Sequence, residues 1–129
     1  ASLAALHGAM TESTAAAHRA GGELAEMAAQ LDAVVQRLAA VTAGMFAAGD
    51  IDAALANSAI YLEAFGHVVI AWIWLEQLLA AAGRTGDFFD GKRQAARYFF
   101  RYELPKTGPQ LDLLESLDRT TLEMRPECF

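Results

Sequence analysis

No proline interrupts the first 104 residues of this 129-residue chain, and this constrains its fold more than any other feature. Proline breaks a helix because it lacks a backbone N–H donor and because its ring clashes with the preceding turn. All 3 prolines lie at or beyond position 105. Alanine, which loses least on entering a helix, supplies much of the 54% hydrophobic share. The sequence therefore predicts long helices and an all-α fold.

Apolar residues recur at spacings of three and four along most of the chain, which is the period of an amphipathic helix. Glycine and proline divide this pattern into segments. The expected elements are three long helices and a shorter fourth, over residues 23–48, 51–82, 87–103 and a short stretch that starts at 107–109. Short connections between long helices favour antiparallel neighbours, so we expect an up-and-down antiparallel helical bundle.

The domain organisation follows from the same pattern. Residues 1–22 carry a weaker periodicity and are expected to form an N-terminal connecting helix or a linker. Residues 23–129 are expected to form the helical bundle domain, with a C-terminal tail that ends at Phe129. A chain of this length is sufficient for one domain with a hydrophobic core.

The middle of the second expected helix, residues 64–75, is apolar on nearly every side. A membrane span is the first alternative, but a bilayer requires roughly 20 apolar residues, and this run is shorter. Glu63, His67 and Glu76 also bracket or interrupt it. A helix that is apolar all round is more simply buried all round, either at the centre of a bundle or between subunits. We therefore expect no membrane span.

Two tryptophans, Trp72 and Trp74, lie in this apolar run. Residues two apart are separated by about 200° around a helix, so the two indoles cannot share one face. One of them can fill the domain core while the other meets a different surface. An aromatic pair is more often packing than a cofactor site, but burial on two sides indicates a partner.

The formal net charge is -6, yet six of the 10 basic residues are concentrated in residues 84–106. An acidic chain is a poor nucleic-acid binder, because neutralising phosphates requires a cationic surface. We therefore expect no nucleic-acid partner. Within the basic segment, Arg93, Arg97 and Arg101 recur every four residues and are expected to form one ridge along the third helix.

Three guanidinium groups on one ridge repel one another unless anions neutralise them. In one interpretation, Asp87, Asp90, Glu103 and acids of other helices neutralise the ridge in a solvated or domain-facing ion network. In the other, the ridge contacts a phosphate of a nucleotide or coenzyme A, or an acidic surface of a partner protein. The sequence leaves both interpretations open.

Catalytic and metal-ligating residues do not occur in a recognisable arrangement. A di-iron or di-manganese site in a bundle requires paired Glu-x-x-His motifs and further glutamates, whereas Glu63 and His67 are four apart and occur once. We expect His67 to be a buried histidine that hydrogen-bonds Glu63 or a neighbouring helix. No phosphate-binding glycine loop and no nucleophile elbow occurs. We predict no catalytic residue and no metal, and assign no cofactor-binding residue.

The single cysteine, Cys128, lies one residue from the end of the sequence and cannot form an internal disulfide. The absence of a disulfide framework fits a reducing compartment. The N-terminal residues do not have the charged and apolar regions of a signal peptide. We expect a cytoplasmic protein.

Two blocks of the sequence resemble a known family. Residues 57–75, NSAIYLEAFGHVVIAWIWL, resemble the central helix of a C-terminal domain found in one branch of the acyl-CoA dehydrogenases. Residues 91–105, GKRQAARYFFRYELP, are similar to the next helix of that domain and its exit. The branch includes 3-methylmercaptopropionyl-CoA dehydrogenase-like enzymes and large actinobacterial fatty acyl-CoA dehydrogenases. The resemblance covers roughly residues 23–122, and the two blocks have the same order and spacing as in the family.

The resemblance implies a C-terminal accessory or assembly domain that follows the body of an acyl-CoA dehydrogenase in fatty acid metabolism. In the family that body binds FAD, and a glutamate removes the substrate α-proton while a hydride passes to the flavin. No residue of this chain matches the catalytic base or the flavin site, so we expect no catalysis and no bound cofactor in this chain alone.

The expected partners are the remainder of the dehydrogenase or its subunits, in a homo-oligomer, and contact with acyl-CoA is left open. The candidate residues for an interface or for a phosphate are Arg93, Arg97, Arg101, His67, Trp72 and Trp74. The alternative function is an autonomous helical module that dimerises through the apolar second helix.

Overall fold

The computed structural model describes residues 2–129, which are built from helices. The α-helices are α1 (Leu3–Ala20), α2 (Gly22–Ala47), α3 (Ile51–Leu55), α4 (Ser58–Ala80), α5 (Asp87–Tyr98), α6 (Thr107–Glu115) and α7 (Thr120–Glu123). A π-helical turn (Phe99–Glu103) and a 3₁₀ turn (Leu104–Lys106) join α5 to α6, and a last 3₁₀ turn covers Pro126–Cys128. These described residues contain no strand, so the predicted all-α class is confirmed.

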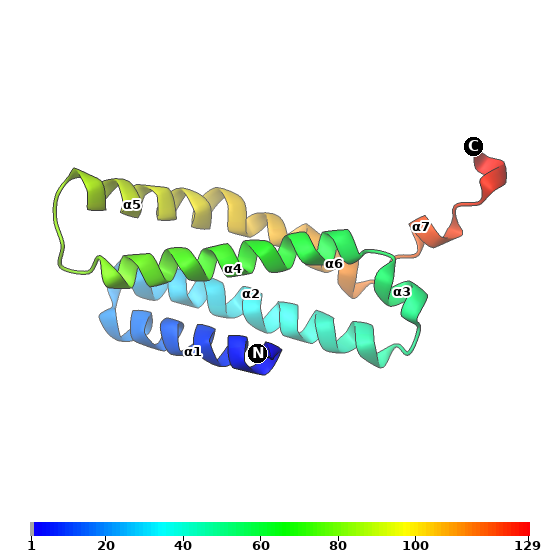
Figure 1. Cartoon of the computed structure of the whole chain (residues 1–129), viewed down its shortest axis with the longest axis horizontal. Helices are drawn as coiled ribbons and strands as arrows, with labels where there is room; N and C mark the ends of the chain where they lie inside the picture. Colours follow the sequence, from blue (N-terminus) through cyan, green and yellow to red (C-terminus); the bar gives the residue numbers. More distant parts are fainter. Residues whose placement is uncertain (1) are drawn as a thin grey trace.

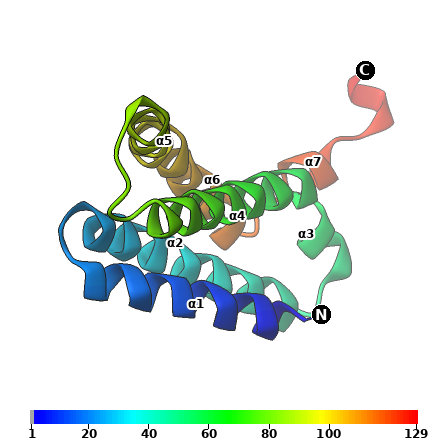
Figure 2. The same ribbon diagram turned by 60° about the vertical axis from the view of Figure 1, so that its left-hand side comes forward.

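Helix α4 is the central element of the arrangement. It packs against α1, α2, α5 and α6. Helices α1 and α2 run side by side on one side of α4, and α5 lies on the other side (Figure 1). Turned by 60°, α5 is seen nearly along its own axis at the edge of the molecule (Figure 2). The segment that follows α6 extends away from the helices (Figure 1).

The hydrophobic core lies where α2, α4 and α6 meet. Its largest fully buried apolar side chains are Leu31, Leu75, Leu104, Leu111, Leu114 and Val68. Full burial of one such side chain contributes roughly 1.5–3 kcal/mol. The core therefore combines residues from distant parts of the chain, and it holds α6 against the two longest helices.

Helix α1 is longer and better packed than the weak periodicity of residues 1–22 predicts. Its buried residues are Met10, Ser13, Thr14 and Ala17. Two of the four are polar, so the residues of α1 that face the core do not form a regular apolar pattern in the sequence. Gly21 (φ 75°) and Gly22 (φ 55°) form the joint with α2, in a backbone region that L-residues rarely adopt. The division of the chain at residue 22 stays a prediction.

The single helix predicted over residues 51–82 is wrong, because the structure has two helices there. The chain leaves helical geometry at Asn57, whose φ and ψ are -119° and 30°. Asn57 is buried, and its side-chain amide donates to the carbonyl of Asp118 at 3.0 Å. This long-range hydrogen bond replaces helical continuity and separates α3 from α4.

The predicted helix over residues 87–103 is α-helical only as far as Tyr98 and continues as the π turn. Pro105 cannot continue a regular α-helix, because its ring would clash with the carbonyl four residues earlier. Within the π turn, the carbonyl of Phe100 accepts a hydrogen bond from the Gln30 side chain of α2 at 2.7 Å. The expected set of three long helices and a shorter fourth thus differs from the observed set, in which α1 is long and α5 is short.

Candidate functional site

The most unusual surface lies on α4, on the side turned away from the core. We call this surface the α4 outer face and define it by Leu62, Gly66, Ile70 and Ile73. Leu62, Ile70 and Ile73 are 67%, 44% and 45% exposed. The opposite side carries the buried residues Ala64, Val68, Ala71, Leu75 and Leu78. The helix is therefore not buried on every side at the centre of the bundle, and the alternative expectation, burial between subunits, stays a prediction.

Helix α4 is long and apolar enough to cross a membrane by length and composition, and only 22% of its most apolar window is buried. The core helix of a bundle can have the same length and composition. Trp72 donates its indole N–H to Ser13 of α1 at 2.8 Å, and Ser13 donates in turn to the Glu76 carboxylate. These polar contacts attach one flank of α4 to α1. The expectation of no membrane span stays a prediction.

The two tryptophans have different surroundings. Trp72 is half-buried and faces α1 through its hydrogen bond to Ser13. Trp74 is also half-buried, and it packs against the hydrophobic core, as Trp72 does, but has no hydrogen bond to α1 among the described residues. Neither indole is fully buried, so each retains some surface exposed to solvent.

His67 lies on the flank of α4 that faces the π turn. One ring nitrogen, Nδ1, is 2.9 Å from the backbone carbonyl of Glu63, and Nε2 is 3.4 Å from the Glu103 carboxylate. The ring also stacks on Phe99 with centroids 5.9 Å apart. Hydrogen bonds from Lys106 and, more weakly, from His67 hold the pKa of Glu103 below its usual range. His67 therefore connects two elements and is not paired with the Glu63 carboxylate.

Arg93 and Arg97 are occupied by partners inside the chain. The Arg93 guanidinium donates to the carbonyls of Ala81 and Arg84, at 3.1 and 2.5 Å, and lies 3.2 Å from the Asp90 carboxylate. Its role is to cover the C-terminal end of α4, where the last backbone carbonyls lack helical partners.

The Arg97 guanidinium makes a two-point contact with Glu23 of α2, through Nε at 2.5 Å and a terminal nitrogen at 2.9 Å. The ion-network interpretation of the ridge therefore holds for Arg97 and Arg93. Arg101 is exposed, and no carboxylate lies within ion-pair distance of it among residues 2–129. The π turn disturbs the four-residue register between Arg97 and Arg101, because its hydrogen bonds span five residues.

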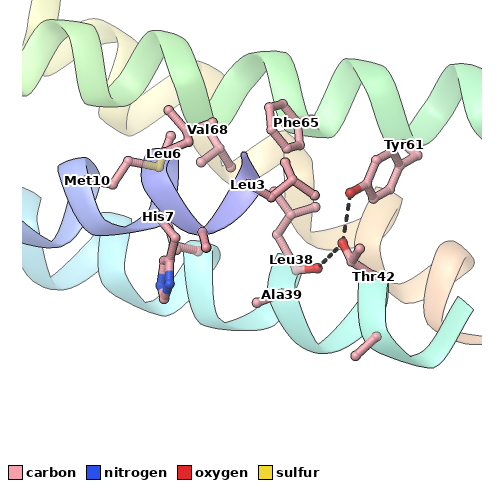
Figure 3. Close-up of a pocket in the computed structure, with 13 residues that line it drawn as sticks. Leu3, Leu6, His7, Met10, Leu38, Ala39, Thr42, Tyr61, Phe65 and Val68 are labelled. Carbon is pink, nitrogen blue, oxygen red and sulfur yellow. Dashed lines mark hydrogen bonds between the residues drawn. The ribbon is translucent and has the colours of Figure 1, made fainter. Parts of the chain in front are cut away.

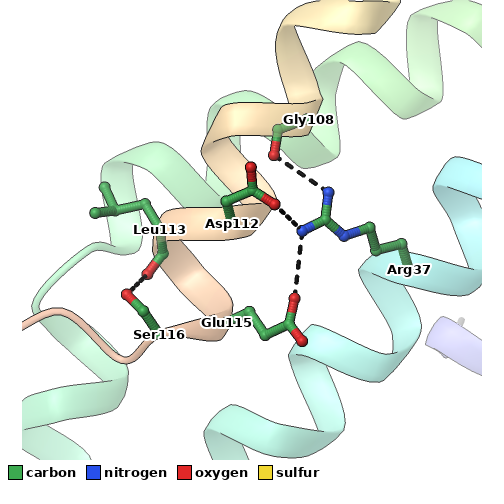
Figure 4. A network of polar contacts seen from close by, with 6 residues as sticks. All are labelled: Arg37, Gly108, Asp112, Leu113, Glu115 and Ser116. Carbon is green, nitrogen blue, oxygen red and sulfur yellow. Dashed lines mark hydrogen bonds and ion pairs between the residues drawn. The ribbon is translucent and has the colours of Figure 1, made fainter.

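A second arginine network was not predicted from the sequence. Arg37 of α2 lies between Asp112 and Glu115 of α6, donates to both carboxylates, and also donates to the Gly108 carbonyl at 3.3 Å (Figure 4). These hydrogen bonds raise the pKa of Arg37. The network ties α6 to α2. Its only signal in the sequence is two acids three residues apart on one short helix.

An apolar cavity lies between α1, α2 and α4 and has a volume of about 340 Å³. Its walls are mainly apolar, and Tyr61, Phe65 and Val68 of α4 face Leu3 and Leu6 of α1 and Leu38 of α2 across it (Figure 3). The Thr42 and Tyr61 hydroxyls are 2.8 Å apart on one side. The sequence did not predict this cavity, because residues of three helices form it.

The chemistry of these sites is binding and not catalysis. The cavity supplies His7, Thr42 and Tyr61 as its polar side chains and no lysine or arginine. A flavin dinucleotide requires donors or cations for its pyrophosphate, so the residues present do not fit FAD. Within residues 2–129, no three His, Cys, Asp or Glu side chains are grouped as metal ligands require. The predicted absence of metal and cofactor stays a prediction.

The comparison with protein families adds one finding. The model of the family described as "Acetyl-CoA dehydrogenase C-terminal like" matches residues 6–125. No curated protein and no solved structure matches the chain significantly. The matched region extends from the first turns of α1 to beyond α7, and it includes the surfaces described above except for Leu3 and Ala4 at the cavity. This chain is therefore a member of the acetyl-CoA dehydrogenase C-terminal-like family.

Proposed function

We propose that this chain is the C-terminal accessory and assembly domain of a FAD-dependent acyl-CoA dehydrogenase, and that it has no catalytic activity alone. The observation that carries the proposal is the exposed α4 outer face in a member of this family. Soluble monomers rarely expose contiguous apolar surfaces, and those that do generally use them for interaction. The proposed occupant of the α4 outer face is the catalytic body of the dehydrogenase.

The composition of the face supports close packing against that body. Gly66 lies in the middle of α4 between the exposed Leu62 and Ile70, and nothing lies within 4 Å of the position that a Cβ atom would take. A glycine inside a helix is destabilising by roughly 0.5–1 kcal/mol relative to alanine. The packing of this chain does not explain that cost. A partner that approaches the backbone closely does explain it.

The finer parts of the proposal concern the parent enzyme. The blocks 57–75 and 91–105 support the 3-methylmercaptopropionyl-CoA dehydrogenase-like branch, with FAD and the catalytic glutamate in the preceding body. We place the enzyme in the cytoplasm and in fatty acid metabolism, and we propose that it is a homo-oligomer. We also propose that the helices of this domain form an up-and-down bundle, which is the scaffold of the domain. Contact with a coenzyme A phosphate would fall to Arg101, since Arg93 and Arg97 have partners inside the chain.

The test uses the parent enzyme with the substitution Ile73→Glu in this domain. A charged side chain on the α4 outer face would be buried without a partner against the body, which costs several kcal/mol. We expect loss of assembly on size-exclusion chromatography together with loss of dehydrogenase activity. The thermal midpoint of the isolated chain should change by little, because Ile73 is 45% exposed there.

Leu122→Glu is the matched control, because Leu122 is a similarly exposed apolar residue, 38%, in the distant helix α7. It should leave both assembly and activity unchanged. If Ile73→Glu assembles and turns over acyl-CoA like the unmodified enzyme, the proposed docking through α4 is wrong.

The second candidate function is an autonomous module that dimerises through α4, and the same exposed face supports it. It predicts that Ile73→Glu abolishes self-association of the isolated chain. The first candidate predicts that self-association does not depend on Ile73. Sedimentation velocity of the isolated chain with and without this substitution separates the two.

A further inference from the structure

The apolar cavity between α1, α2 and α4 has the size of a small-molecule site. Its volume is about 340 Å³, and ligand pockets span roughly 300–1,000 Å³. Met10, Leu38 and Val68 line it as buried side chains, whereas Leu3 and Ala43 line it as exposed ones. The cavity therefore extends from the core to solvent, and a ligand can enter it without unfolding the bundle.

The lining of the cavity disfavours a charged ligand. Among the described residues that form its wall, none is an Asp, Glu, Lys or Arg. A carboxylate or a phosphate that entered would lose its water without gaining an ion-pair partner, which is strongly unfavourable. The exposed His7 ring lies at the opposite end of the cavity from the Thr42 and Tyr61 hydroxyls (Figure 3). The wall therefore fits a ligand that is uncharged and mainly apolar.

The two hydroxyls in the wall determine which polar group this ligand carries. Thr42 Oγ1 is 2.8 Å from the Leu38 carbonyl oxygen and 2.8 Å from the Tyr61 hydroxyl oxygen. A carbonyl oxygen can only accept, so Thr42 donates its hydrogen to Leu38, and Tyr61 donates its own to Thr42. These two bonds use both hydroxyl hydrogens. The remaining lone pairs of the two hydroxyl oxygens can accept a hydrogen bond from a ligand, but neither hydroxyl can donate one.

The volume of the cavity limits the length of the ligand. An apolar cavity of roughly 150 Å³ holds a benzene ring. A cavity of about 340 Å³ has room for roughly twice as many carbon atoms. Aliphatic chains of about eight to twelve carbons are within this limit.

We propose that the cavity binds an uncharged medium-chain amphiphile whose polar end is a hydrogen-bond donor, namely an aliphatic alcohol. The donor group lies at the Thr42 and Tyr61 hydroxyls, and the aliphatic chain packs between Leu6, Leu38 and Phe65 (Figure 3). The site distinguishes an alcohol from a ketone or a carboxylate of the same length, because only the alcohol donates. It contains no residue of the α4 outer face, so it does not depend on the proposed assembly function.

NMR titration of the full ¹⁵N-labelled chain tests the proposal with 1-octanol, 2-octanone and octanoate. We expect 1-octanol to shift the amide signals of cavity residues on all three helices. It should bind about threefold to tenfold more tightly than 2-octanone, which corresponds to one net hydrogen bond, and octanoate should not bind. Equal affinity for the three compounds overturns the proposal. So does an absence of shifts with 1-octanol up to its solubility limit, or shifts confined to residues outside the cavity.

Thr42→Val tests the direction of the hydrogen bonds. The substitution nearly preserves the shape of the side chain but releases the Tyr61 hydrogen, which can then be donated to a ketone oxygen. The preference for 1-octanol over 2-octanone should therefore disappear. Thr11→Val is the matched control, because the Thr11 hydroxyl also donates to the carbonyl four residues earlier, His7, at 2.9 Å but does not line the cavity. A preference that persists in Thr42→Val shows that the assigned hydrogen bonds are wrong.

Ala39→Phe tests the location of the bound chain. Ala39 is an exposed alanine in the wall of the cavity, so a phenylalanine there adds bulk beside the ligand without disturbing a buried position. The shifts caused by 1-octanol should be lost. Ala33→Phe is the matched control, since Ala33 is an exposed alanine of the same helix outside the cavity, and it should leave binding unchanged. Equal affinity of the two variants for 1-octanol excludes the cavity as the site.

Discussion

Glu23 and Arg97 are 74 residues apart in the sequence, yet they form the two-point ion pair that joins α2 to α5. The hydrogen bond from Arg97 is the main reason that the pKa of Glu23 lies below its ordinary value, and the charges of Arg97 and Arg101 add to it while burial opposes it. Glu23 also lies in the first turn of α2, where the helix dipole favours a negative charge. Arg97, the middle arginine of the predicted ridge, is therefore structural.

The pH dependence of stability follows from this ion pair. Because the folded-state pKa of Glu23 is lowered, its contribution is fully present above the ordinary value of 4.5 and is lost as pH falls through the folded pKa. Glu23→Gln should therefore reduce the stability lost between pH 6 and pH 3. The difference should be less than about 1 kcal/mol, since the pair is partly exposed to solvent.

Urea unfolding at the two pH values measures this difference. Glu12→Gln is the control, because Glu12 is an exposed acid with no ion pair within residues 2–129. If Glu23→Gln and the unmodified chain lose equal stability on acidification, the pair with Arg97 does not contribute.

At the scale of single elements, the helix boundaries depend on hydrogen bonds to other elements. The break between α3 and α4 is held by Asn57, and the π turn after α5 is held by Gln30. Both side chains are amides that bond a backbone carbonyl more than 60 residues away in the sequence. A local pattern cannot reveal such a bond, so the predicted helices continued where the real ones end.

The hydrogen bond from Gln30 to the π turn can be tested by substitution. Gln30→Met keeps the length of the side chain but leaves the Phe100 carbonyl without its donor, which costs about 1–3 kcal/mol for a buried group. We expect the free energy of unfolding in urea to fall by that amount. Gln36→Met, at an exposed position of the same helix, should change it by less than about 0.5 kcal/mol. Equal effects of the two substitutions would contradict a role for Gln30 at the turn.

At the scale of the whole molecule, α4 is apolar on two opposite sides that have different roles. One side packs into the core, where Leu75 is 0% exposed, and the other is the exposed α4 outer face, where Leu62 is 67% exposed. Only the first side stabilises the fold of this chain. The second side is not needed for that fold, and its exposure supports the proposed assembly function.

The two sides of α4 are distinguished by truncation. Leu75→Ala should lower the free energy of unfolding by about 2–5 kcal/mol, because it leaves a cavity in the core. Leu62→Ala should lower it by less than about 0.5 kcal/mol, and it should weaken assembly of the parent enzyme instead. A similar loss of stability from both substitutions in urea unfolding would show that Leu62 belongs to the core of this chain.

Much of the fold was determined by the sequence itself. The all-α class, the positions of α2 and α6, and the family followed from the absence of proline before residue 105, the periodicity and the two matching blocks. These are local properties, because helix propensity and hydrophobic period act over a few turns.

Only the tertiary structure decided which of the apolar and charged side chains are used within the chain. It buried the polar Ser13 and Thr14 on α1, left Ile70 and Ile73 of α4 exposed, and paired Arg97 with Glu23. Burial and ion pairing depend on which distant residues come together, and a helical period does not carry that information.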